Sequence, residues 1–125
     1  MDTEQFFHDI RDRVVDFGRY ALAIQPMVRN LSKPGDNVAS SALTDADFIV
    51  QEGLQRVFLD LPYKFTLACE ENSPYNSLFN HNTDVKVTVD PVDGTWWYAH
   101  KKPCFGVIVS VYKNNTLDGT LIHMP

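Results

Sequence analysis

The chain has 125 residues, of which 44% are hydrophobic and 22% are charged, and its net charge is −5. These proportions are typical of a globular protein, and the length fits one domain of ordinary size. The acidic balance argues against nucleic acid as a partner, because nucleic-acid-binding proteins present clustered basic surfaces. The sequence contains no apolar run long enough to span a membrane and no basic secretory signal, so we expect a cytoplasmic protein without membrane contact.

The first part of the chain favours helices. Hydrophobic residues recur at steps of three and four over residues 3–30, which predicts an amphipathic helix capped by Asp2 or Thr3. Pro26 lies inside this pattern and should kink the helix, because proline lacks the amide proton that helical hydrogen bonding needs. Beyond a polar loop, the same spacing predicts a second helix that ends before Pro62.

The rest of the chain favours strands. Short apolar or alternating runs, separated by turn-forming residues, predict four strands at residues 65–69, 85–90, 104–112 and 117–123. The first is apolar enough to be a buried strand, and the last two should be joined by a tight turn at residues 113–115. Two helices followed by a run of strands predict an α+β fold, with two helices packed on a mostly antiparallel sheet.

The segment Asp90-Pro91-Val92-Asp93-Gly94-Thr95 carries the clearest chemical signal. Its two carboxylates and the carbonyl of Val92 offer oxygen ligands, which Mg²⁺ prefers. Gly94 lets the backbone approach a ligand closely, and the amides of Gly94 and Thr95 can face an anion. The alternative is an ordinary solvated turn, because Asp-Gly after a strand is common in loops.

Acidic residues upstream of this segment have two interpretations each. Glu70 follows a predicted strand and can share a metal cluster with Asp90 if the two strands are neighbours, but adjacent glutamates are usually solvated. Asp47 closes the pattern Thr44-Asp45-Ala46-Asp47, which matches a helix capping box as well as a catalytic position. These residues alone leave both alternatives open.

Taken together, three segments resemble the N-terminal motifs of the inositol monophosphatase family: residues 43–47, Cys69-Glu70-Glu71 and Asp90–Thr95. That family is grouped with fructose-1,6-bisphosphatases and bisphosphate nucleotidases as metal-dependent phosphatases. The resemblance covers nearly the whole chain in order. It implies that Mg²⁺ is the cofactor, and that residues 1–125 are an N-terminal metal-binding domain, one half of a layered αβαβα fold.

The resemblance also implies a role for each candidate site residue. The metal ligands would be Glu70, Asp90, Asp93 and the carbonyl of Val92. Asp47 and Thr95, assisted by Glu70, would orient and deprotonate the attacking water, and the amides of Gly94 and Thr95 would hold the phosphate. The bulky Trp96 beside this turn can stack on a substrate ring.

Three features depart from the family pattern. Cys69 replaces the glycine that usually precedes the glutamate pair, and we interpret it as a small buried residue rather than a reactive thiol. Trp96-Trp97-Tyr98 replaces a less bulky stretch, and we expect Trp97 and Tyr98 to pack in the core. The Trp-Asp motif of the family's second half is absent, because neither tryptophan precedes an aspartate.

Two hypotheses for function follow from these observations. The first is a Mg²⁺-dependent phosphomonoester hydrolase that acts on inositol monophosphate or a similar small phosphorylated alcohol by attack of a metal-activated water. We expect its full-length form to be a homodimer. The alternative is a truncated or degenerate, non-catalytic phosphatase half that serves as a metal-binding or interaction module.

Overall fold

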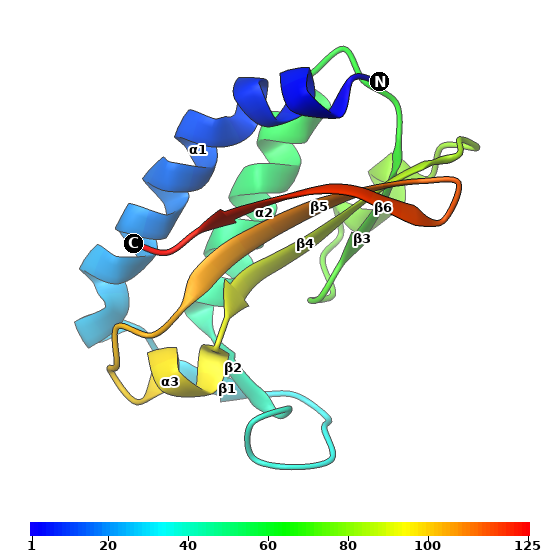
Figure 1. Cartoon of the computed structure of the whole chain (residues 1–125). Helices are drawn as coiled ribbons and strands as arrows, with labels where there is room; N and C mark the ends of the chain where they lie inside the picture. Colours follow the sequence, from blue (N-terminus) through cyan, green and yellow to red (C-terminus); the bar gives the residue numbers. More distant parts are fainter.

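The computed structural model describes residues 1–125 as an α+β fold with two sheets (Figure 1). The helices are α1 (Thr3–Ile24), α2 (Asp45–Leu59) and α3 (Thr95–Ala99), with 3₁₀ turns at Gln25–Met27 and Asn76–Phe79. The strands are β1 (Asn30–Ser32), β2 (Ala42–Thr44), β3 (Thr66–Cys69), β4 (Val85–Asp93), β5 (Gly106–Lys113) and β6 (Thr116–His123). None of the helices carries a stretch that is long and apolar enough to cross a lipid bilayer.

Helix α1 forms where hydrophobic side chains recur on one face. Its buried residues are spaced by three or four positions: Phe6, Ile10, Val14, Gly18 and Ala21. The Asp2 carboxylate accepts a hydrogen bond from the Gln5 amide at 2.9 Å and caps the first turn, as predicted. The prediction of a helix to residue 30 was wrong at its end. A 3₁₀ turn containing Pro26 follows Ile24, and Asn30 then begins β1, because proline cannot continue the helical hydrogen bonds.

Helix α2 begins at the capping box that the sequence predicted. Thr44 Oγ1 accepts a hydrogen bond from the Ala46 amide at 3.2 Å, and the Asp47 carboxylate accepts one from the Thr44 amide at 2.8 Å. The helix packs against both α1 and β4. Asp47 is fully buried as a result, so the cap also places a carboxylate inside the protein.

The main sheet has the strand order β3-β4-β5-β6. Strand β3 pairs with β4 in parallel, whereas β4 with β5 and β5 with β6 are antiparallel, so the predicted mostly antiparallel sheet is confirmed. Both long helices lie on the same face of this sheet (Figure 1), and the hydrophobic core fills the space between them. At one end of the core, the rings of Phe6, Phe58 and Phe65 pack with centroids 5.7 to 5.8 Å apart.

Two strands differ from the sequence prediction. None of the residues of β3 is buried, because β3 is an edge strand; only Phe65, which precedes it, enters the core. Strand β4 runs on through Pro91 to Asp93 instead of ending at Asp90. Its register against β5 shifts between Asp90 and Asp93, and such an irregularity accommodates a proline within a strand.

The tight turn predicted at residues 113–115 joins β5 to β6. Asn114 and Asn115 have φ angles of 50° and 63°, and two successive positive φ angles are the signature of a type I′ hairpin turn. This turn fixes the register of the last two strands, and the predictions of both strands hold to within a few residues.

Helix α1 contacts β6 where Gly18 faces the ring of His123. A Cβ atom on Gly18 would lie only 2.4 Å from Cδ2 of His123. Alanine favours a helix over glycine by up to about 1 kcal/mol, so the contact and the helical propensity act in opposite directions at this position.

We expect Gly18→Ala to lower the free energy of unfolding by about 1–3 kcal/mol, because the added methyl group overpacks the helix against β6. In a His123→Ala background the same change should raise stability, since the ring is gone and only the helical propensity remains. Urea unfolding of the four proteins measures both effects. An equal effect of alanine in both backgrounds would contradict the proposed contact.

Candidate metal and phosphate site

The parallel pairing of β3 with β4 brings two carboxylates side by side. Cys69 lies opposite Val89 in the register, and the Glu70 amide donates a hydrogen bond to the Val89 carbonyl at 3.2 Å. Glu70 and Asp90 are the next residues along their two chains and therefore emerge together. The hypothesis of a shared metal cluster required neighbouring strands, and the structure has them.

Asp90 lies where its negative charge is unfavourable. Its Oδ1 atom is buried and has no hydrogen-bond partner. Burial raises the pKa of Asp90 well above its usual range, and the hydrogen bond with Glu70 and the charges of Glu70 and Asp93 raise it further. A cation against this oxygen would satisfy it and offset the repulsion between the carboxylates.

A cavity of about 260 Å³, which we call the acidic cavity, opens beside these two residues. It is lined by all the residues that the sequence predicted to bind metal or phosphate: Glu70, Asp90, Val92, Asp93, Gly94, Thr95 and Trp96. Lys33, Ser40 and Trp97 also line it, together with two alanines. Segments far apart in the sequence thus meet in one hollow, while the roles of the individual residues stay predictions.

Gly94 connects β4 to α3 at a position that only glycine fits well. Its φ angle is 87°, in the left-handed region that other residues rarely adopt. A Cβ atom there would also lie 2.8 Å from the carbonyl oxygen of Cys104. The backbone path from Asp93 to Thr95, and with it the shape of the acidic cavity, therefore depends on glycine.

Asp47 lies behind the wall of the acidic cavity, and its two oxygens serve different partners. Oδ2 accepts the capping hydrogen bonds from Thr44, whereas Oδ1 lies 2.9 Å from the Thr95 hydroxyl. That hydroxyl is also 2.8 Å from the Val92 carbonyl, and its one proton can go to only one of the two acceptors. An ionised Asp47 therefore draws the Thr95 proton toward itself. The capping and catalytic interpretations of Asp47 are thus compatible.

Asp47 gains and loses its proton slightly below neutral pH. Burial raises the pKa of Asp47 to about 6, although hydrogen bonds from Thr44 and Thr95 act in the opposite direction. A carboxylate with a pKa in this range accepts a proton more readily than an ordinary aspartate and is still largely ionised at pH 7.

Lys33 is a site residue that the sequence did not reveal. Its ammonium lies 3.1 Å from Glu70 and 2.5 Å from Glu71, whose side chain is only 3% exposed. Burial opposes the charge of Lys33, but hydrogen bonds and attraction from the two glutamates outweigh burial and raise its pKa. Gln51 holds Glu71 from behind, since its amide exchanges hydrogen bonds of 2.8 and 2.9 Å with the Glu71 backbone. No spacing in the sequence predicts these contacts, because they join segments far apart in the chain.

The aromatic residues of α3 divide between the core and the surface. Tyr98 is fully buried and its hydroxyl donates to the Ala21 carbonyl at 2.6 Å, which confirms its predicted place in the core. The same prediction for Trp97 was wrong, because this side chain is 50% exposed. Successive residues of a helix point about 100° apart, so a short helix that buries Tyr98 turns Trp97 outward. The ring of Trp96 stacks on that of His100, with centroids 4.0 Å apart.

Cys69 is partly buried rather than buried as predicted, and it behaves as the unreactive residue that we inferred. Burial raises the pKa of its thiol to about 12, so the thiolate that reactive cysteines require is not formed near neutral pH. The thiol lies 3.6 Å from the side-chain amide of Gln55. Cys69 and Cys104 are both free thiols.

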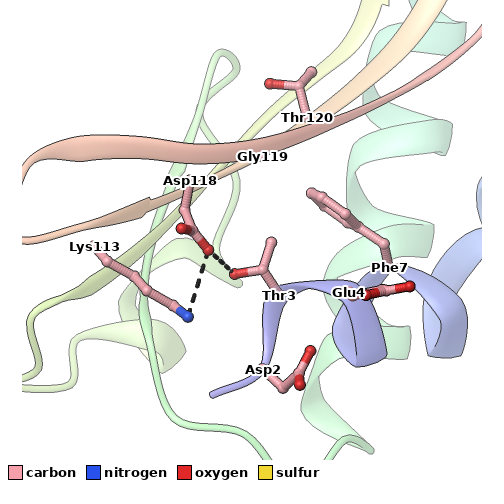
Figure 2. A pocket seen from close by; sticks show the side chains of 8 residues that line it. All are labelled: Asp2, Thr3, Glu4, Phe7, Lys113, Asp118, Gly119 and Thr120. Atoms are coloured by element: carbon pink, nitrogen blue, oxygen red, sulfur yellow. Dashed lines mark hydrogen bonds and ion pairs between the residues drawn. The ribbon is translucent and has the colours of Figure 1, made fainter.

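The largest cavity of the structure, about 550 Å³, lies elsewhere, between the start of α1 and β6 (Figure 2). The charge of Asp118 is already partnered there: the carboxylate accepts a hydrogen bond from the Thr3 hydroxyl and lies 3.4 Å from Lys113. The hydrogen bond from Thr3 lowers the pKa of Asp118, and the interaction with Lys113 lowers it further by a smaller amount. No buried polar side-chain atom that lines this cavity lacks a partner. Chemistry therefore favours the smaller acidic cavity as the site.

The donors around the acidic cavity fit a hard cation such as Mg²⁺. They are carboxylate oxygens and a backbone carbonyl, and the unpartnered Oδ1 of Asp90 is an atom that a cation would satisfy. As the side chains stand, no three His, Cys, Asp or Glu residues converge closely enough to hold a metal ion. In this arrangement the ammonium of Lys33 pairs with both Glu70 and Glu71 and offsets one of their two negative charges.

The raised pKa of Asp47 predicts how stability depends on pH. The unfolded chain ionises Asp47 near pH 3.8 and the folded chain near pH 6, so this residue lowers stability as the pH rises through that window. Asp47→Asn keeps the capping geometry and removes the titration. We expect the stability of the variant relative to wild type to rise by about 2 kcal/mol between pH 4 and pH 7, measured by urea unfolding.

Asp45→Asn, on the same helical turn, is the control, because its stability relative to wild type should change with pH in the opposite direction. A hydrogen bond from Arg29 lowers the pKa of Asp45, so wild type should gain stability over this variant as the pH rises. A difference between wild type and Asp47→Asn that does not change with pH would contradict the buried titration.

Comparison with known proteins identifies the family. The model of the inositol monophosphatase family matches residues 18–125. Similar solved structures include the extragenic suppressor protein suhB of Bartonella henselae, with 17% identity and a TM-score of 0.79 over 97% of this chain and 45% of that one. A staphylococcal IMPase has 14% identity and a TM-score of 0.76 over 99% and 45% of the two chains, and the IMPase of Thermotoga maritima has 18% and 0.74 over 98% and 45%. No curated protein sequence matches the chain.

At these identities the structures establish the fold, and the family model establishes the relationship. The chain spans 45% of the length of each of the three structures and matches the N-terminal part of their fold, as the sequence motifs implied. The family is metal-dependent, in agreement with the oxygen donors of the acidic cavity. With residues 18–125 matched, the chain belongs to the inositol monophosphatase family.

Proposed function

We propose that this chain forms the metal- and phosphate-binding part of a Mg²⁺-dependent phosphomonoesterase. Its substrate would be inositol monophosphate or a similar small phosphorylated alcohol. The observation that carries the proposal is the acidic cavity itself, which collects Glu70, Asp90 and Asp93 and has Thr95 in its wall with Asp47 hydrogen-bonded behind it. Membership in a family of phosphatases supports the same conclusion.

Four groups of the chain would hold the metal: Glu70, Asp90, Asp93 and the carbonyl of Val92. When bound, Mg²⁺ polarises phosphoryl oxygens and lowers the pKa of a coordinated water. The carboxylates compensate the charge of the cation, and the cation removes the cost of placing Asp90 beside Glu70.

The Asp47–Thr95 pair would remove a proton from the attacking water. Thr95 gives its hydroxyl proton to Oδ1 of Asp47 and takes a proton from the water, so one proton passes from water to Asp47. Glu70 would assist by orienting the same water from the opposite strand. The amides of Gly94 and Thr95 would hold the phosphate in line with the water, and an in-line displacement needs no covalent intermediate on the enzyme.

The test is phosphate release from inositol monophosphate, with and without Mg²⁺, by the longest natural polypeptide that contains these 125 residues. Asp93→Asn should reduce Mg²⁺-dependent release by about 100-fold, because it removes a charged ligand. Asp84→Asn is a matched control, since Asp84 is an exposed aspartate just before the other end of β4. Full activity of Asp93→Asn would rule out its role as a ligand.

The second candidate is a non-catalytic half that binds metal or a partner. One observation favours it: its acidic side chains do not converge on a metal as they stand. The ammonium of Lys33 also stabilises the glutamate pair without any other cation. Such a module would bind Mg²⁺ without turning over a phosphate ester.

Titration calorimetry of the 125-residue chain with Mg²⁺ alone tests the cation site under either candidate. Asp90→Asn should weaken binding and Lys33→Met should tighten it, each by about tenfold, because the two changes remove opposite charges beside the same cation. Lys64→Met, which changes an exposed lysine outside the acidic cavity, is the control, and circular dichroism verifies folding. Shifts of the same sign in both variants would contradict the assignment. Tight binding with no phosphate release would favour the second candidate.

A further inference from the structure

Helix α2 buries two ridges of side chains that differ in polarity. Each ridge follows steps of four residues, so its members lie on one side of the helix. The apolar ridge belongs to the hydrophobic core: Ala46, Val50, Leu54 and Phe58. The second, which we call the polar ridge, is equally buried: Asp47, Gln51 and Gln55. Glutamine is seldom fully buried, because a buried amide costs free energy unless hydrogen bonds satisfy it. Hydrogen bonding rather than packing therefore defines this side of α2.

The first two members of the polar ridge hold segments that line the acidic cavity. Oδ1 of Asp47 lies 2.9 Å from the hydroxyl of Thr95, which lines that cavity. One turn later, the side-chain amide of Gln51 donates to the Glu71 carbonyl at 2.8 Å and accepts from the Glu71 amide at 2.9 Å. Glu70, the residue before Glu71, also lines the acidic cavity. A single helix therefore fixes the segment after β3 relative to the turn after β4.

The backbone at Glu70 is anchored on both of its sides. The Glu70 amide donates to the Val89 carbonyl of β4 at 3.2 Å, and the next amide along the chain, that of Glu71, donates to Gln51. Two successive amides with different partners fix the direction in which the Glu70 side chain leaves the backbone. If the anchor at Gln51 is lost, the Glu70 carboxylate is free to shift relative to Asp90, and a site for a shared cation tolerates little displacement.

A second amide supports Gln51 at the Glu71 carbonyl. Nδ2 of Asn76 donates to this carbonyl at 3.2 Å, and Oδ1 of Asn76 accepts a hydrogen bond from Gln55 at 2.6 Å. Gln55 thus reaches the glutamate segment only through Asn76, and its own Oε1 is buried without a partner. Gln51 is the direct link, because its donor and its acceptor both bind Glu71.

We propose that Gln51 is a positioning residue for the cation site, which holds Glu70 where its carboxylate can share a metal ion with Asp90. This inference rests on the proposed function of the acidic cavity. Gln51 is not among the residues that line the cavity, so it acts through the glutamate segment. A neutral amide suits this role, because it supplies one donor and one acceptor and adds no charge beside the cation.

The test is titration calorimetry with Mg²⁺ alone on the longest natural polypeptide that contains these residues. Gln51→Met keeps the length of the side chain and removes both hydrogen bonds, so we expect Mg²⁺ binding to weaken about tenfold. Val50→Ala is the matched control, since it disturbs the packing of the neighbouring residue on the apolar ridge and should leave Mg²⁺ affinity unchanged. Circular dichroism verifies that each variant is folded at the temperature of the titration.

A double-mutant cycle separates positioning from a general loss of stability. Because Gln51 acts through Glu70, Gln51→Met should weaken Mg²⁺ binding much less in a Glu70→Gln background than in wild type. In an Asp90→Asn background the weakening should persist, since Asp90 belongs to the other strand. Asn76→Ala is a milder variant at a partly exposed position, and it should weaken Mg²⁺ binding in the same direction by a smaller factor.

Equal Mg²⁺ affinity of Gln51→Met and wild type, or an equal effect of Gln51→Met with and without Glu70→Gln, would overturn the positioning role. If Asp90→Asn still weakens binding in that case, the proposed function stands without it. If the wild-type protein does not bind Mg²⁺, the proposed function and the positioning role fail together. Should Gln51→Met not fold, Asn76→Ala decides the question, and unchanged Mg²⁺ affinity in that variant would overturn the role.

Discussion

The parallel pairing of β3 with β4 sets Glu70 beside Asp90, and the acidic cavity is built around that pair. Two carboxylates in a partly buried place repel each other and lose hydration, so the pairing costs free energy. The raised pKa of Asp90 and its unpartnered oxygen are the visible signs of that cost. A fold that accepts such a cost at one point usually does so at a site of function.

Cations offset this repulsion, and the chain supplies one of its own. The Lys33 ammonium reaches the glutamate pair from the loop between β1 and β2, while Gln51 on α2 holds the backbone of Glu71 by two hydrogen bonds. Glu71 thus has an ion-pair partner, whereas Oδ1 of Asp90 has no hydrogen-bond partner. The cavity is therefore only partly neutralised by the protein, which leaves a place where a metal ion would be stabilised.

The helical layer contributes to the same site through Asp47. One carboxylate oxygen caps α2 and the other accepts a hydrogen bond from Thr95, so the residue that caps a helix also contacts the wall of the acidic cavity. This double use explains why a capping box and a catalytic motif can share one stretch of sequence. The short helix α3 divides its side chains in a similar way, with Tyr98 in the core and Trp97 half-exposed at the acidic cavity.

The sequence alone determined the features that depend on residues close together in the chain. Helical periodicity, the cap at Thr44, the turn at Asn114 and the oxygen-rich segment from Asp90 to Thr95 all follow from local patterns, and the structure contains each of them. The three family motifs also predicted the residues of the candidate site, because the order of these motifs along the chain is itself a sequence pattern.

Only the tertiary structure decided the relations between distant segments. It made β3 an exposed edge strand, placed it parallel to β4, brought Lys33 to the glutamates and left Trp97 in solvent. Each outcome depends on which elements pack together, and that choice is set by the burial of the whole core rather than by any short stretch of residues. The segment from Asp90 to Thr95 could therefore be recognised from its residues, while the acidic cavity that it lines could not.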